Sequence, residues 1–337
     1  MSSQFSTSTR PPKHFHPPNV CFTDSFLDAG FLFDNDAVAK IYFSYVDSGG
    51  SVTLPMLQRS ITGSNFTDLT SPYGYGGPVI VGEPNTTEFL SRWTDWAQDN
   101  GVVSAFVRVD PVSGNHASFP QFAQYASPTV LIPCGRDVDI VQNLSKRVRK
   151  NYRRGERLGL ETEVSTSVTT DDLVGFRTTY ESTMNRLDAQ EIYYPRTQWW
   201  RHISASTSEL GVVLTTTRLE GRIQAQGLRL KYRETAYAFL SCTTDEGRTN
   251  NSAEYDKICF LLWCQNEGIE IVNFGGGLGG RQDTLLEHKR RFAPNAPVAP
   301  FYVGKLVFLP SAYQQLSGAA ADDSTFFPSY RSLTNKP

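Results

Sequence analysis

A recurring order of predicted secondary structure limits the folds open to this chain more than any single motif does. In the first half, residues 41–57 read as two strands joined by a tight turn. A helix over 85–101, which has an apolar stripe and ends at a glycine, precedes a buried strand over 102–111. Strands, a helix and a further strand in this order predict an α/β unit.

The second half repeats this order. A helix over 171–187 precedes a set of strands over 211–244, and a helix over 253–268 precedes a strand over 269–274. Two similar α/β units are therefore predicted, joined near residues 135–145.

The chain ends differ in composition from the part between them. Residues 1–20 are rich in Ser, Thr and Pro and are predicted to be a disordered tail. The two units are assigned to 21–142 and 143–300. The segment 301–337 is expected to return to the first unit and to end, from about Ser317, in a polar tail.

The composition suits a globular intracellular protein. With 337 residues, of which 39% are hydrophobic, the chain is long enough to form two cores. Its net charge of −2 gives no overall positive field that would attract nucleic acid. The five cysteines are an odd number without a C-x-x-C pair, which predicts reduced thiols. No apolar run reaches the length of a membrane span and no apolar leader begins the chain. We expect a cytoplasmic protein.

A glycine run after the strand at 269–274 spells G-x-G-x-x-G at Gly275, Gly277 and Gly280. A dinucleotide site also needs a following βαβ unit and an acidic residue about 20 positions later. Too few residues follow Gly280, and 294–321 contains no Asp or Glu. The run is therefore either a flexible loop or the floor of a cleft at a strand end, with Lys289 on the next helix facing it.

A basic helix is predicted to open the second unit. Leu144, Val148 and Tyr152 are spaced four apart and would dock it, which leaves a cationic face exposed. Such a face is either solvated or contacts phosphates, which position RNA without reading its sequence. Seven basic residues stand here against one acid, Glu156, and are the candidate tRNA-binding residues: Lys146, Arg147, Arg149, Lys150, Arg153, Arg154 and Arg157.

Four segments in order resemble the FemXAB family of aminoacyl-tRNA-dependent peptidyltransferases. They are SPYGYGGP, the basic helix, YESTMNRLDAQEIYY and the glycine run with its following helix, at 71–78, 144–164, 180–194 and 273–294. The resemblance spans roughly residues 25–315. It implies a mixed α/β fold of two tandem GNAT-like domains with a cleft between them. No heptad run is long enough for a coiled-coil arm, so the chain resembles the compact branch.

The expected cofactor turn of a CoA-dependent GNAT protein is missing. That turn, Q/R-x-x-G-x-G/A, holds the pyrophosphate at a helix N-terminus. Its place here, 245–252, reads DEGRTNNS. A GNAT shape without this turn needs another acyl donor, and the resemblance implies an aminoacyl-tRNA ester, with no cofactor and no metal.

The implied reaction is aminolysis of that ester, for which positioning and stabilisation of the oxyanion suffice. Lys289 matches the family's lysine and is the candidate oxyanion and leaving-group partner, unless it is only an exposed helix lysine. His288 stands where the family usually has Phe, and would either stack on the terminal adenosine or shuttle a proton.

The acceptor is implied to be a peptide with a free amine, either a uridyl-peptide antibiotic intermediate or a peptidoglycan precursor. Tyr73 and Tyr75 would line its groove or pack beneath a tight turn. Together with these, the candidate substrate-binding residues are Arg196, Gly275, Gly276 and Gly277. The protein is expected to act as a monomer.

Two other functions stay open. An N-acyltransferase using CoA or a carrier protein predicts a saturable acyl-CoA site. A non-catalytic binder of RNA or peptide predicts RNA retention that survives Lys289→Ala.

Overall fold

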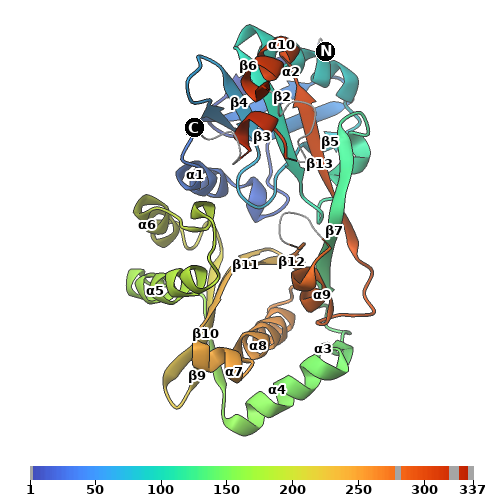
Figure 1. Cartoon of the computed structure of the whole chain (residues 1–337). Helices are drawn as coiled ribbons and strands as arrows, with labels where there is room; N and C mark the ends of the chain where they lie inside the picture. The colour runs from blue at the N-terminus through green and yellow to red at the C-terminus, as the bar shows by residue number, and fades with distance from the viewer. Residues whose placement is uncertain (1–2, 278–281, 319–325, 333–337) are drawn as a thin grey trace. The chain divides into compact units, whose positions relative to one another are not determined.

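The computed structural model describes residues 3–277, 282–318 and 326–332, which form two compact units (Figure 1). Unit 1 comprises Met1–Ala126 with Phe301–Pro337, and unit 2 comprises Ser127–Pro300. The division lies earlier than the predicted residue 142, because strand β7 (Ala123–Pro133) pairs antiparallel with β12 (Ile271–Gly275) of unit 2.

Unit 1 is a mixed sheet with helices packed on it. The sheet order is β1-β2-β3-β4-β6-β13, with β5 on β3, and only the β4–β6 pair is parallel. Its elements are β1 (Gln4–Ser8), α1 (Asp24–Phe33), β2 (Ala37–Val46), β3 (Gly50–Ser60), β4 (Thr67–Thr70), β5 (Val79–Gly82), α2 (Thr86–Asp99), β6 (Val102–Val109), β13 (Ala299–Val307) and α10 (Pro310–Ser317). The core gathers around Phe89 and Trp93 of α2, whose rings stack at 6.0 Å.

Both chain ends differ from the predicted tails. Gln4–Ser8 forms β1 against β2, and Phe5 packs on Phe43 of the core at 6.4 Å, so the prediction of disorder for this segment was wrong. Near the other end, Arg331 pairs with Asp36 at 2.7 Å and with the buried Asp68. These ion pairs attach a segment that composition alone marks as a polar tail.

Unit 2 is a sheet between two helical layers. Its order is β7-β12-β11-β10-β9-β8, and only the β11–β12 pair is parallel. Helices α5 and α6 cover one face and α8 the other (Figure 1). Besides β7 and β12, its elements are α3 (Ile140–Asn143), α4 (Lys146–Leu158), β8 (Glu161–Ser165), α5 (Thr170–Arg186), α6 (Thr197–Ala205), β9 (Val212–Leu219), β10 (Arg222–Tyr232), β11 (Thr235–Thr243), α7 (Asp245–Thr249), α8 (Ser252–Asn266) and α9 (Thr284–Arg290).

Helix α8 is the core element of unit 2. Ile258, Phe260, Leu261 and Cys264 are buried around its circumference, as expected for a helix enclosed by a sheet and other helices. All five cysteines of the chain are free thiols. In the described part of the chain, no helix combines the length and the apolar character needed to cross a membrane.

Candidate functional site

Helix α4 docks on α8 through the stripe that the sequence predicts. Leu144 and Val148 are buried, and Tyr152 stacks on Tyr255 of α8 at 5.2 Å. Gly155 lets the two helices approach closely, because a Cβ at this position would lie 2.5 Å from the Tyr255 ring. The docked face fixes which side of α4 points outward.

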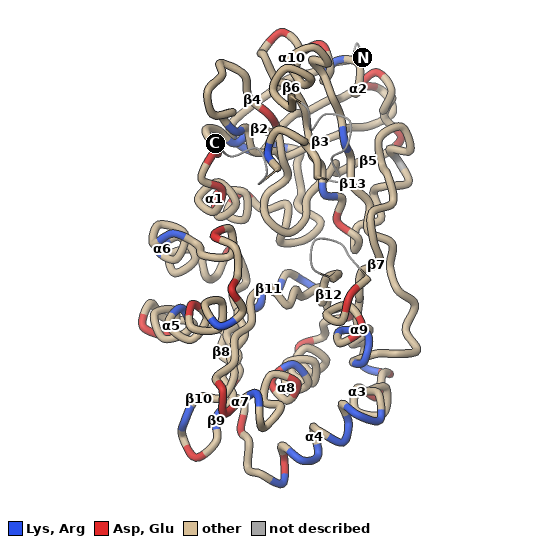
Figure 2. The backbone as a smooth tube through the Cα atoms, in the orientation of Figure 1, with Lys and Arg blue, Asp and Glu red and all other residues tan. Residues whose placement is uncertain are grey.

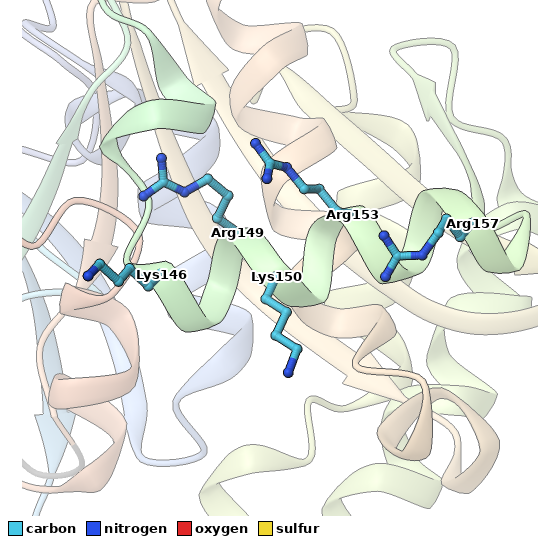
Figure 3. Close-up of a pocket in the computed structure, with 5 residues that line it drawn as sticks. All are labelled: Lys146, Arg149, Lys150, Arg153 and Arg157. Atoms are coloured by element: carbon cyan, nitrogen blue, oxygen red, sulfur yellow. The ribbon is translucent and has the colours of Figure 1, made fainter.

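Basic residues recur along α4 (Figure 2), and most of them are exposed. All seven predicted cations lie on this helix, and six of them are exposed while Arg149 is partly buried. Among the residues that the structure describes, none of the seven forms an ion pair with a carboxylate. Five of them line a shallow hollow along the helix (Figure 3): Lys146, Arg149, Lys150, Arg153 and Arg157. The arrangement is suited to a polyanion that follows the helix surface.

The glycine run ends β12 in a bulged turn. The register with β7 shifts between Asn273 and Gly275, and Gly275 has φ +76°, a conformation that favours glycine. The N–H of Gly275 donates to Oδ1 of Asn273 at 2.7 Å. Bulges of this kind re-aim the chain next to functional sites. Gly276 and Gly277 follow in the turn, while Gly280 lies outside the described residues.

Lys289 lies at this turn, as the sequence predicts. Helix α9 begins at the cap Asp283, whose carboxylate accepts the N–H of Leu286 at 2.9 Å. One turn later, Nζ of Lys289 donates to the carbonyl oxygen of Gly276 at 2.6 Å. Burial lowers the pKa of Lys289 to about 8, with Asp283 acting in the opposite direction. The ammonium is thus poorly solvated and has no carboxylate partner within the described residues.

His288 points to a buried carboxylate on α8. Its Nδ1 lies 3.6 Å from Oε1 of Glu254, whose Oε2 accepts from Nδ2 of Asn151 on α4 at 2.7 Å. Burial and the charge of Lys257 lower the pKa of His288, while Glu254 acts in the opposite direction. Its ring meets the Phe292 ring edge-to-face at 5.6 Å. Glu254 therefore links the basic helix to α9.

Three polar residues of this region were not predicted from the sequence: Asn151, Glu254 and Lys257. Asn151 contacts Glu254 only because α4 packs on α8. A signal was present, since Glu254, Asp256 and Lys257 place three charges in the first half of a helix whose middle is apolar.

A buried ion pair joins α8 to strand β10 of the sheet. Arg229 of β10 pairs with Asp256 of α8 at 2.6 Å, and both side chains are almost fully buried. Arg229 also donates to Ser241 at 2.8 Å and lies over the Phe260 ring. Gly227 provides the space, because a Cβ there would lie 2.1 Å from the guanidinium.

Of the predicted substrate-binding residues, Gly275, Gly276 and Gly277 lie in the glycine turn, while Tyr73 and Tyr75 belong to unit 1. In unit 1, Tyr73 stacks on Phe33 at 4.6 Å and Tyr75 meets Phe301 edge-to-face at 5.6 Å, so both rings pack against neighbours. Arg196 is exposed at the N-cap of α6, on the sheet face opposite to α8. The structure brings α4, the glycine turn and α9 together within unit 2, but it does not bring Arg196 to them.

Comparison with known proteins places this site in a known fold. The acetyltransferase (GNAT) domain family matches residues 143–289, which include α4, the glycine turn and Lys289. No curated protein matches the sequence.

Several solved structures match most of the chain, among them the following three. FemX has a TM-score of 0.62 at 12% identity, over 86% of this chain and 92% of its own. L-PGS from Bacillus licheniformis gives 0.54 at 12%, over 85% and 89%. A tandem GNAT protein from the clavulanic acid biosynthesis pathway gives 0.50 at 10%, over 90% and 98%. The predicted fold, mixed α/β with two tandem GNAT-like units, is confirmed.

Proposed function

We propose that this protein transfers an aminoacyl group from aminoacyl-tRNA to the amine of a peptide acceptor. The acceptor amine attacks the ester carbonyl, a tetrahedral oxyanion forms, and the bond to the tRNA ribose breaks. The amine loses a proton and the ribose oxygen gains one, so the products are an amide and a free tRNA end. The similarity in fold to FemX supports this proposal.

The basic face of α4 is the observation on which the proposal rests. Seven cations on a helix of 13 residues repel one another, Glu156 is the single acid of the helix, and among the described residues none of the seven forms an ion pair. Such a surface is stable at low cost only where it meets an anion. RNA phosphates supply that anion in the required density.

Lys289 supplies the chemistry next to this surface. Its ammonium, held at the Gly276 carbonyl, would stabilise the oxyanion and then the leaving ribose oxygen. The lowered pKa of about 8 keeps most of the population protonated at pH 7 and eases proton donation to the leaving group.

The N-terminus of α8 is unsuited to the pyrophosphate of CoA. The segment before it folds as α7, which contains Asp245 and Glu246, and the first turn of α8 contains the buried Glu254. Carboxylates at a helix N-terminus take the place that an anionic ligand would need.

An acyl-CoA-dependent N-acyltransferase is the second candidate, favoured by the family match over residues 143–289. For the acceptor, the proposal keeps a peptide amine carried by a uridyl peptide or a peptidoglycan precursor.

The decisive experiment offers the purified protein labelled aminoacyl-tRNAs or labelled acetyl-CoA, with amine acceptors that include a muropeptide nucleotide and a uridyl peptide. Acceptor-dependent discharge of one aminoacyl-tRNA, abolished by ribonuclease, is expected. Label arriving only from acetyl-CoA would establish the second candidate instead.

A further inference from the structure

Arg108 of β6 directs its guanidinium to the end of β4 in unit 1. Its Nη1 donates to Oγ1 of Thr70 at 3.3 Å and to the carbonyl oxygen of Ser71 at 3.1 Å. The guanidinium carbon also lies 4.8 Å from the centre of the Phe106 ring. These contacts hold the planar group in one orientation, while its Nε and Nη2 form no hydrogen bond within the described residues.

No carboxylate forms an ion pair with Arg108 in the part of the chain that the structure describes. Asp34, which acts on Arg108 from a distance, pairs with Arg59 at 3.4 Å. Burial and the charge of Arg59 lower the pKa of Arg108 to about 10, while Tyr73 and Asp34 act in the opposite direction. Hydrogen bonds to neutral oxygens compensate only part of the cost of withdrawing a guanidinium from water. Arg108 therefore has unused capacity to bind an anion.

The unbonded edge of the Arg108 guanidinium is accessible. The residue is only partly buried, and neither Nε nor Nη2 is among the buried polar atoms that lack a partner. Because these two nitrogens have no partner within the described residues, they are in contact with solvent. Nε and Nη2 form the edge on which a carboxylate or a phosphate accepts two parallel hydrogen bonds.

A carboxylate matches this edge better than a diphosphate does. One guanidinium supplies a single positive charge, and the nearby Arg59 is already paired with Asp34 and with the buried Asp68. A ligand with several negative charges would need further unpaired cations, whereas a single carboxylate is neutralised by Arg108 alone.

Arg108 also borders the segment 71–78. Its backbone N–H donates to Oγ of Ser71 at 3.0 Å, and its carbonyl oxygen accepts the N–H of Gly76 at 2.9 Å. We infer that the free edge of Arg108 binds the carboxylate of a peptide, which under the proposed function is the acceptor. The inference rests on that function and deepens it, because it selects acceptors that carry a free carboxylate as well as the reacting amine. The carboxylate is bound and does not react.

The first test uses the wild-type protein and does not depend on the folding of a variant. Phenylglyoxal modifies guanidinium groups, and mass spectrometry of the digested protein measures the rate at Arg108. The probes are alanylalanine, its C-terminal amide and inorganic phosphate at equal ionic strength. At about ten times its Kd, alanylalanine should slow the modification of Arg108 about tenfold. Arg92, an exposed residue of α2 that pairs with Glu88 at 2.9 Å, should react at the same rate throughout.

The amide should give no protection, because it carries no negative charge at its C-terminus. Equal protection of Arg108 by the acid and the amide, or no protection by either, would overturn the carboxylate site. Protection by phosphate as strong as that by alanylalanine would show a general anion site and would also contradict the inference.

A second test measures the binding of labelled alanylalanine and its amide to three variants. Arg108→Met should weaken binding of the acid about tenfold, as for the loss of a charged hydrogen bond, and leave binding of the amide unchanged. Arg108→Lys should restore part of the affinity for the acid, and Arg92→Met should bind as the wild type does. Equal weakening of acid and amide in Arg108→Met would give Arg108 a structural role only.

Both tests omit the acyl donor, so their outcome is separate from that of the proposed function. Binding of the carboxylate at Arg108 without discharge of any aminoacyl-tRNA would support this site and contradict the proposed function. Discharge of an aminoacyl-tRNA without any difference between acid and amide would overturn the site and leave the proposed function intact.

Discussion

The two units treat the ends of their parallel strand pairs in opposite ways. In unit 1 the loop after β4 returns to β6: the N–H of Gly76 donates to the carbonyl of Arg108 at 2.9 Å, and the N–H of Asp110 donates to Gly76 at 3.0 Å. In unit 2, the pairing of β11 with β12 ends at Tyr237 and Asn273, while β11 continues to Thr243. Unit 1 closes the gap between its strands with its own backbone, and no such return of the chain is found among the described residues of unit 2.

The two units also differ in how their charged side chains are paired. In unit 1, Lys40 pairs with Asp24 and Asp28, and Asp68 lies between two arginines. In unit 2, the basic face of α4, Lys257 and Lys289 have no carboxylate partners within the described residues. The two units thus differ in their charged residues, and this difference is consistent with the proposal that donor binding and chemistry belong to unit 2.

The largest effect is expected from the buried ion pair of unit 2. Arg229→Ala leaves Asp256 buried and uncompensated, which should lower the free energy of unfolding by about 3–5 kcal/mol. Arg59→Ala in unit 1 should cost less, because Asp68 keeps Arg331 as a partner. Denaturant unfolding of both variants measures the difference. An equal loss of unfolding free energy in the two variants would show that Arg331 does not compensate the charge of Asp68 once Arg59 is removed.

Replacing Lys289 tests where the chemistry occurs. Lys289→Met removes the ammonium at the glycine turn and should lower kcat for aminoacyl transfer by about 10² or more, with tRNA binding retained. Lys305→Met in unit 1 is the matched control and should have wild-type kinetics. A loss below about threefold in Lys289→Met would make Lys289 a bystander.

The pH profile sharpens this test. The ammonium of Lys289, with its pKa of about 8, is present below that pH and is lost above it, so kcat should fall as pH rises through about 8. Lys289→Arg keeps its charge and should lack this falling limb. An unchanged limb in Lys289→Arg would assign the ionisation to another group.

Charge reversal on α4 should have a smaller effect, because several cations share the contact. Lys150→Glu with Arg153→Glu should raise the KM for aminoacyl-tRNA about tenfold and flatten its dependence on salt, with kcat nearly unchanged. Steady-state kinetics at several salt concentrations measure both changes. The same KM at every salt concentration would remove α4 from the donor site.

How far the sequence predicts this molecule depends on how local each feature is. The docking stripe of α4 and the position of Lys289 after a glycine turn follow from spacing alone, and both are found in the structure. Strands β1 and β7 were not predicted, because each pairs with a strand distant in the sequence. Glu254 was missed for the same reason, since Asn151 and His288, which it faces, lie on other helices.

The smallest effect is expected from a substitution in the loop of unit 1 that follows β4 and returns to β6. Gly77 has φ +99°, and a Cβ there would lie 3.3 Å from Cα of Val109. Gly77→Ala should therefore lower the free energy of unfolding by about 1–2 kcal/mol and leave the KM for aminoacyl-tRNA unchanged. Gly63→Ala is the control: it has φ +75° but no neighbour within 4 Å, so it introduces backbone strain without crowding. A raised donor KM in Gly77→Ala would extend the donor site to unit 1 and break the division of labour between the units.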